Sequence, residues 1–212
     1  MLRLLLIVSL AAIFSADSLC AASIEGHVTL PKAPAPAVIS QRYEVVSQSG
    51  VISVNPPLAI VYLEGKFERT ADPKVEQMKQ HDFTFYPAVL PIQVGTRVEF
   101  PNEDDAYHNI FSYSAPKRFD LGRYRKDEHP VPSEVFDKAG LVTLRCDIHE
   151  HMRAIILVLE TPHFVLSGPD GNFRLSDVPA GRYVLKAWIN SKTTLERPIE
   201  IPPDGVLRVD FP

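Results

Sequence analysis

The sequence predicts an all-β fold. Its 212 residues contain 19 prolines against 10 glycines, and proline is tolerated at turns and strand edges but breaks helix interiors. Short segments rich in β-branched and aromatic residues recur along the chain and are separated by turn-forming residues. Only 72–80 has helical features, with Asp72 as a possible N-cap, Pro73 at the first helical position and helix formers after it. We expect at most one short helix there.

The expected strands follow in chain order from alternation and from β-branched content. Ser23 to Leu30 alternates in the manner of a strand, and 90–100 divides into two strands around Gly95. The turn 146–151 joins two further strands, 140–146 and 152–159. The other expected strands are 51–54, 58–63, 83–85, 172–181, 182–188 and a pair within 198–211 around Asp204 and Gly205.

The first 22 residues have the character of a signal peptide. Arg3 precedes the apolar run 4–14, which is too short for a spanning helix because such a helix needs roughly 20 apolar residues. The small residues at 20–22 form a plausible cleavage site. A lipoprotein with a lipidated Cys20 is the alternative, but Leu19 occupies a position where a small residue is expected. We therefore expect a bacterial protein that is periplasmic or otherwise exported, with no integral membrane segment after signal removal.

The composition limits the class of protein. Hydrophobic residues make up 45% and charged residues 23% of the chain, and the formal net charge is -4. This is an ordinary globular composition, and the lack of a basic stripe argues against a nucleic-acid partner. Loss of the signal peptide removes Cys20 and leaves Cys146 alone. Exported proteins usually pair their cysteines, so a lone one is buried and inert, intermolecular, reactive or bound to a metal.

Four residues form a candidate metal site. Cys146, His149 and Met152 lie on the turn between two expected strands, and His108 follows another. Structural zinc sites use four strong tetrahedral ligands, often several cysteines, whereas one cysteine, two histidines and a weak methionine make the trigonal site of blue copper. Each residue alone also fits a core or loop position, but together they predict bound copper. His151 is an alternative axial ligand.

The stretch from Phe85 to Leu159 resembles the cupredoxins, the fold of plastocyanin and amicyanin. The resemblance rests on the Cys-x2-His-x2-Met spacing, the Val-Glu-Phe-Pro-Asn strand end at 98–102, the pair His108-Asn109 and the strand before Cys146. The whole arrangement is similar to bacterial methylamine-utilisation or plastocyanin-like proteins. Residues 112–139 are longer and more polar than in small cupredoxins and include 119–124 as an added segment.

This resemblance implies a cupredoxin-like Greek-key β-sandwich over residues 80–160. It implies that copper is bound by His108, Cys146, His149 and Met152. It also implies that Asn109 lies close to the thiolate and ties the ligand loops together, with backbone N–H bonds to sulfur tuning the reduction potential.

The last fifty residues resemble a small prealbumin-like β-sandwich of the carboxypeptidase-regulatory type. The similarity rests on the motifs at 170–173 (Asp-Gly-Asn-Phe) and 177–183 (Asp-Val-Pro-Ala-Gly-Arg-Tyr). That family starts with a Gly-x-Val strand, which residues 25–28 supply. We therefore expect the N-terminal strands, 23–65, to pack with 161–212, so that the cupredoxin unit is inserted between them. Three consecutive pieces are the simpler alternative.

The site predicts a one-electron carrier between redox protein partners and not an enzyme. An enzyme needs an exchangeable ligand position, and Met152 at the axial spacing argues for a closed site. The alternatives are a mononuclear copper oxidoreductase and a copper carrier or structural copper-binding module, although carriers use Met/His-rich tracts and this chain has three methionines. His149 is the expected electron exit. The acidic cluster 103–105 is interpreted as a solvated loop, with a docking patch as the alternative.

Overall fold

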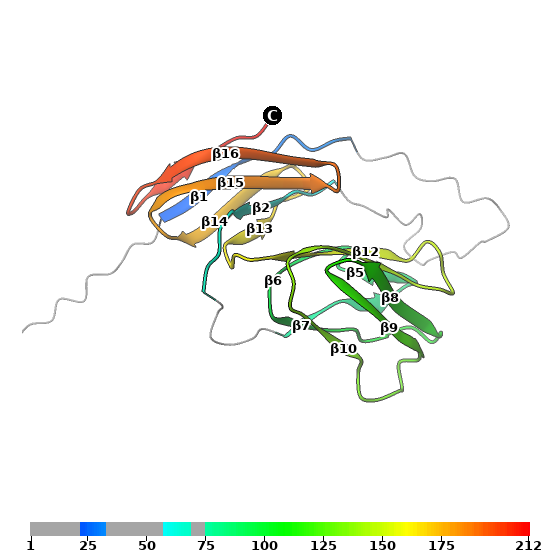
Figure 1. The fold of residues 1–212 in the computed structure, drawn as a ribbon. Helices are drawn as coiled ribbons and strands as arrows, with labels where there is room; N and C mark the ends of the chain where they lie inside the picture. Colours follow the sequence, from blue (N-terminus) through cyan, green and yellow to red (C-terminus); the bar gives the residue numbers. More distant parts are fainter. Residues whose placement is uncertain (1–21, 33–56, 69–74) are drawn as a thin grey trace, which may run out of the picture.

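The computed structural model describes residues 22–32, 57–68 and 75–212. These residues form β-strands without any helix, which confirms the all-β prediction. The strands assemble into two stacked units, one above the other in Figure 1. Residues 1–21 of the predicted signal peptide and the expected strand at 51–54 lie outside the described residues, whereas Ala22, the last residue of that predicted peptide, is buried in the first strand.

None of the described residues belongs to a helix that could cross a membrane.

The lower unit in Figure 1 is a sandwich of two sheets. The larger sheet has the order β6 (Val89–Gln93), β12 (Arg153–Leu159), β11 (Gly140–Arg145), β8 (His108–Ser114) and β9 (Lys117–Tyr124). The smaller has the order β10 (Ser133–Phe136), β7 (Thr96–Glu99) and β3 (Val75–Gln77). Both sheets contribute buried side chains to one core, among them Val98, Ile110, Phe136, Leu144 and Ile156. Because successive strand residues face opposite sides, each strand supplies every second residue to this core.

The helix expected over 72–80 is wrong for the described part of that segment. Residues 75–77 form β3, which pairs in parallel with β7. Residues 79–81 form β4 (Lys79–His81), which makes a hairpin with β5 (Thr84–Tyr86). Met78 and Gln80 are fully buried. Helix propensity is a weak preference, and here strand pairing and burial of alternate side chains override it.

The other unit combines strands from both ends of the described chain. One sheet places β1 (Ala22–His27) between β14 (Asn172–Val178) and β17 (Val206–Arg208). The other has the order β13 (Phe164–Leu166), β2 (Ile60–Leu63), β15 (Gly181–Asn190) and β16 (Thr193–Ile201). The N-terminal strands thus pack with the C-terminal ones, and the lower unit interrupts this sandwich in the sequence.

The predicted strand pair around Gly205 needs one correction. Strands do lie on both sides of this turn, but β16 pairs with β15 and β17 pairs with β1. Strands β16 and β17 therefore belong to different sheets, and the chain crosses from one sheet to the other at this turn. The resemblance of this sandwich to prealbumin-like domains stays a prediction.

A small apolar cluster joins the two units. Ile60 and Trp188 from the sandwich are buried together with Val89, Leu157 and Leu159 from the lower unit. The contact therefore involves strands β6 and β12 of the five-stranded sheet. The candidate metal donors come instead from β8 and from the loop that follows β11.

Candidate metal centre

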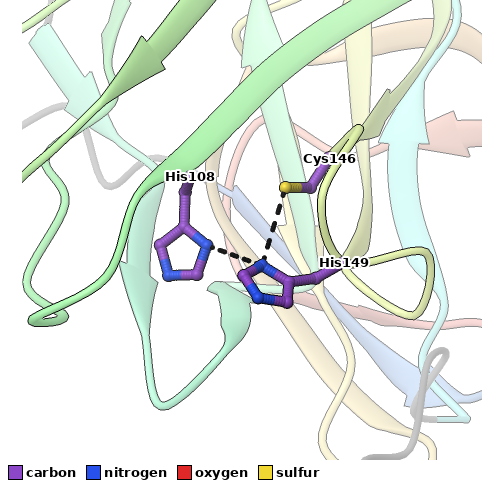
Figure 2. A group of neighbouring side chains, drawn as sticks. All are labelled: His108, Cys146 and His149. Atoms are coloured by element: carbon purple, nitrogen blue, oxygen red, sulfur yellow. Dashed lines mark hydrogen bonds between the residues drawn. The ribbon is translucent and has the colours of Figure 1, made fainter. Parts of the chain in front are cut away.

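Three predicted donors converge at one end of the five-stranded sheet, as Figure 2 shows. His108 begins β8, Cys146 follows the last residue of β11, and His149 lies on the loop before β12. The Nδ1 atoms of the two histidines are 3.1 Å apart, and the Cys146 sulfur lies 3.9 Å from the His149 Nδ1. All three donor atoms lie within 4.8 Å of one another. This group could hold a metal ion.

The antiparallel pairing of β8 and β11 explains why distant residues meet here. The start of β8 and the end of β11 lie at the same sheet end, with Phe111 opposite Arg145. A tight turn then brings His149 back, since the backbone N–H of Met152 donates to the His149 carbonyl at 2.9 Å. His108 is fully buried, whereas His149 is half-buried. His149 is thus the more accessible of the two imidazoles.

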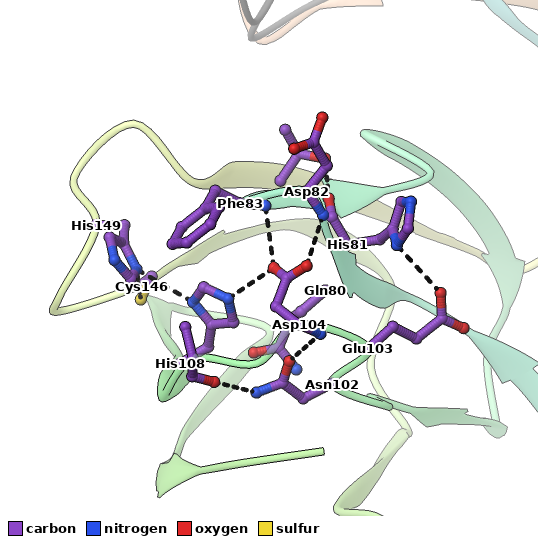
Figure 3. Close-up of polar contacts among 12 residues, drawn as sticks. Gln80, His81, Asp82, Phe83, Asn102, Glu103, Asp104, His108, Cys146 and His149 are labelled. Carbon is purple, nitrogen blue, oxygen red and sulfur yellow. Dashed lines mark hydrogen bonds and ion pairs between the residues drawn. The ribbon is translucent and has the colours of Figure 1, made fainter. Parts of the chain in front are cut away.

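Asp104 orients the first histidine, as Figure 3 shows. Its Oδ2 lies 2.8 Å from the Nε2 of His108. The same carboxylate accepts the backbone N–H groups of Asp82 at 2.7 Å and Phe83 at 3.0 Å. Because a carboxylate only accepts, His108 donates from Nε2, and in the neutral imidazole the lone pair then lies on Nδ1, which faces the other donors. The carboxylate therefore selects the tautomer that can bind a metal through Nδ1.

This role of Asp104 corrects the interpretation of 103–105 as a solvated loop. The Asp104 side chain is only 10% exposed, whereas Glu103 and Asp105 are 38% and 77% exposed. Three consecutive acidic residues carry no sequence signal that separates the inward one from its neighbours. The position of Asp104 four residues before His108 is the one clue that the sequence offers.

The surroundings of Cys146 favour its thiolate. Burial raises the pKa of this thiol, but the side-chain hydrogen bond with His108 and the backbone N–H groups of Asn109, His149 and Ile148 lower it by more. The net result is a pKa below the ordinary value of a thiol. The thiolate is the form that binds metals. The surroundings of Cys146 therefore favour the form of the side chain that can coordinate a metal ion.

The histidines have opposite pKa shifts. Burial, together with the charges of His108 and His151, lowers the pKa of His149. Burial also acts to lower the pKa of His108, but its hydrogen bonds with Cys146 and Asp104 outweigh that effect and raise it. A histidine must be neutral to bind a metal through its free nitrogen. His149 therefore meets this requirement over a wider pH range.

Asn109 makes different contacts through its backbone and its side chain. Its backbone N–H bonds to the Cys146 sulfur. Its side-chain amide, however, donates to Asp120 Oδ1 at 2.7 Å and to the Gly122 carbonyl at 3.1 Å, both on β9. The side chain thus ties β8 to the added segment 119–124 and not to the cysteine loop.

The added segment also holds the cysteine loop directly. Arg123 donates from Nε at 3.0 Å and from Nη2 at 2.8 Å to Oδ2 of Asp147, the residue after Cys146. Strand β9 consequently contacts both segments that carry the three donors, β8 and the loop after β11. The sequence indicated that this part of the chain is extra, but it gave no sign of these contacts.

The two axial candidates occupy different surroundings. Met152 is 1% exposed and belongs to the same buried cluster as Cys146. His151 lies with its Nε2 3.1 Å from the carbonyl of Phe83, and a carbonyl can only accept, so this nitrogen carries a proton. His151 does not belong to the group of converging donors found among the described residues. Met152 therefore lies in the buried core beside Cys146, whereas His151 is bonded to the backbone of the β4–β5 hairpin.

Phe83 is a part of the site that no sequence motif indicated. Its ring packs edge-on against His108 and His149, with centroids 5.5 Å and 5.1 Å away. It reaches them from the turn between β4 and β5, a hairpin in a segment that was expected to be helical in part. Because the sequence does not predict that hairpin, it also does not predict that Phe83 lies near the donors.

No protein-family model matches the chain, and no match was found among curated proteins. Several solved structures are similar to part of it. The copper-containing nitrite reductase NirK from Thermus scotoductus SA-01 is 29% identical, with 47% of this chain and 25% of that chain covered and a TM-score of 0.39. This chain thus spans a quarter of the length of that reductase.

Two smaller proteins are also similar. A purple cupredoxin from Nitrosopumilus maritimus is 23% identical, with 39% of this chain and 98% of that chain covered and a TM-score of 0.34. Amicyanin from Paracoccus versutus is 18% identical, with 46% of this chain and 96% of that chain covered and a TM-score of 0.36. In every case the similarity covers less than half of this chain.

Proposed function

We propose that this protein is an exported type 1 copper protein that carries single electrons between redox protein partners. The observation that carries the proposal is the convergence of two imidazole nitrogens and one thiol sulfur within 4.8 Å. His108, Cys146 and His149 would hold the copper, with Met152 as the weak fourth ligand. When bound, copper supplies the redox chemistry by cycling between Cu(II) and Cu(I).

The donor set favours copper over zinc. A structural zinc site takes four strong ligands, whereas this group offers three, together with the soft thioether of Met152 nearby in the core. Thiolate and thioether donors suit Cu(I), and imidazoles suit both oxidation states. The protein contributes a thiol whose pKa is lowered and a histidine whose tautomer is fixed by Asp104. Both features match the requirements of a copper ligand.

The frame around the donors suits electron transfer. His108 begins a strand that pairs on both sides, with β9 and with β11, and Cys146 is buried at the end of β11. Donors held by such a frame keep their places when the charge of the ion changes. His149 is half-buried, so we propose that electrons enter and leave through its imidazole.

The spectrum of the copper-loaded protein tests the proposal. Addition of Cu(II) to the metal-free protein should produce an intense thiolate-to-copper band in visible light and a narrow hyperfine splitting in electron spin resonance. Both should be lost in Cys146→Ala. A colourless protein, or a band that survives in Cys146→Ala, would contradict the proposal.

The axial ligand is tested by two neighbouring substitutions. We expect Met152→Gln to change the visible spectrum, because the amide oxygen is a different axial donor. His151→Ala should leave the spectrum close to that of the unmodified protein. The reverse result would assign His151 as the ligand.

A further inference from the structure

The geometry points to a residue that controls access to the metal. We propose that Phe83 caps the centre and keeps water and small anions from reaching it, so that the site exchanges electrons but not ligands. This inference rests on the proposed copper function. It assigns a role to a side chain that is not itself a donor.

One aromatic ring covers both histidines. The ring of Phe83 meets His108 and His149 at interplanar angles of 85° and 86°, and the two imidazoles lie 4.9 Å apart between centroids. Figure 3 shows the ring of Phe83 directed toward the two histidines. An apolar ring in this position offers no hydrogen bond to water or to an anion. It therefore makes the side of the imidazoles that it covers unfavourable for polar ligands.

The backbone of Phe83 is fixed on both sides by residues of the site. Its N–H donates to Asp104, which also holds His108. Its carbonyl accepts from Nε2 of His151, which lies two residues after His149. The cap is therefore bonded to the segments that carry both histidine donors. Movement of the hairpin away from the site would break both of these bonds.

The turn that presents Phe83 is held in an uncommon conformation. Asp82 and Phe83 have φ values of 50° and 56°, in the left-handed region that non-glycine residues rarely adopt. Asp104 accepts both of their backbone N–H groups. Backbone strain of this kind persists when surrounding contacts over-determine it, and it is concentrated at functional sites. A glycine would relieve the strain, whereas phenylalanine places a ring over the histidines.

Three variants distinguish the effect of the Phe83 ring from the effect of the backbone turn. Phe83→Gly removes the ring and favours the left-handed backbone, so the hairpin is retained. Phe83→Tyr keeps a ring and serves as the conservative variant. Tyr86→Ala is the matched control, because Tyr86 is an aromatic residue of the same hairpin and is 68% exposed.

The first measurement titrates azide into the copper-loaded proteins. The spectra of the unmodified protein, Phe83→Tyr and Tyr86→Ala should stay unchanged, while Phe83→Gly should gain a saturable azide-dependent band. If Phe83→Gly forms the thiolate-to-copper band but ignores azide, the cap is overturned and the copper function stands. If the unmodified protein forms no such band, the proposed function fails, and with it the role in excluding ligands.

The second measurement needs no metal. Diethyl pyrocarbonate modifies accessible imidazoles, and mass spectrometry reports the rate at each histidine. We expect His149 of metal-free Phe83→Gly to react several-fold faster than in the unmodified protein, while exposed His129 reacts equally in both. Equal rates at His149 would show that Phe83 does not cover it and would overturn the cap whatever the copper spectra show.

Discussion

The two units bury different kinds of polar residue. Among the described residues outside the lower unit, the buried polar side chains are the small hydroxyl residues Ser23, Thr161 and Ser167. The lower unit buries several amides and an imidazole as well as hydroxyls: Gln80, Gln93, Thr96, Asn102, His108, Asn109 and Ser112. Buried amides and imidazoles are costly unless they are hydrogen-bonded. The lower unit therefore needs hydrogen-bond partners for these buried groups.

Several of these hydrogen bonds lie close to the candidate donors. Asn102 donates to the Ala106 and Tyr124 carbonyls, at 2.9 and 3.0 Å, and so holds the loop that leads to His108. The Tyr124 hydroxyl donates to the Phe100 carbonyl at 2.7 Å, and burial raises the pKa of Tyr124. These bonds organise the site, whereas the sandwich rests on an apolar cluster. The hydrogen-bonded polar groups therefore lie in the unit that contains the candidate metal donors.

The largest expected effects on the free energy of unfolding come from substitutions that damage the core of one unit at a time. Phe100→Ala in the lower unit and Phe211→Ala in the sandwich both remove rings that are almost fully buried, so each should cost about 3–5 kcal/mol of unfolding free energy. In denaturant titrations, the copper band would report the lower unit, and the fluorescence of Trp188 would report strand β15 of the sandwich at its contact with the lower unit. Phe100→Ala should move mainly the copper transition and Phe211→Ala mainly the tryptophan transition. Coincident shifts would mean that both units unfold together.

The next effect concerns the carboxylate beneath the first histidine. Asp104→Ala removes the acceptor of the His108 Nε2–H, and loss of such a partner typically lowers metal affinity by about 10–100-fold. Competition with a chelator of known affinity measures this change. Glu103→Ala is the matched control, because Glu103 is more exposed and bonds to Lys79. Equal losses in both variants would show that general acidity, and not the bond to His108, sets the affinity.

A smaller effect is the pH dependence of the metal-free thiol. The folded-state pKa of Cys146 is lowered, so its stabilisation is fully present above the unfolded thiol pKa of about 8.5 and is lost as the pH falls through the folded pKa. Between these two pKa values, the stability advantage of the unmodified protein over Cys146→Ala should rise with pH. Thiolate absorbance in the ultraviolet gives the folded pKa. A folded-state pKa of Cys146 at or above that of an ordinary thiol would contradict the hydrogen bonds described around its sulfur.

The smallest expected effect comes from two surface ion pairs. Arg123–Asp147 next to the site and Arg174–Glu25 in the sandwich have nearly equal exposures, 61% and 39% against 60% and 39%. Exposed pairs contribute little to stability, so Arg123→Ala and Arg174→Ala should both leave the unfolding free energy almost unchanged. Only Arg123→Ala should speed the release of copper to a chelator, because Asp147 adjoins Cys146. Equal release rates would show that β9 does not restrain the loop.

Much of the fold could be predicted because strand signals are local. The β-branched runs before Cys146 and after Met152 form β11 and β12, and Gly95 lies between β6 and β7 as expected. The segment 72–80 was misleading because its capping residues are also local, whereas its pairing with β7 and β5 depends on distant strands. Local signals cannot report such pairings.

In the candidate site, the sequence allows residues to be predicted only through their donor chemistry. His108, Cys146 and His149 have the right atoms and the right spacing, and the structure brings them together. Asp104 and Phe83 could not be predicted, since a carboxylate in an acidic cluster and a phenylalanine in a strand-like segment are ordinary. Their roles arise from one hydrogen-bonded turn that places them beside His108.

Redox titration of the copper-loaded protein tests the central claim most directly. For a one-electron carrier, the thiolate-to-copper band should bleach with one electron per copper and should return completely on reoxidation, with no other substrate present. The copper should stay bound throughout. A band that fails to return, copper that is released on reduction, or uptake of more than one electron per copper would contradict the account.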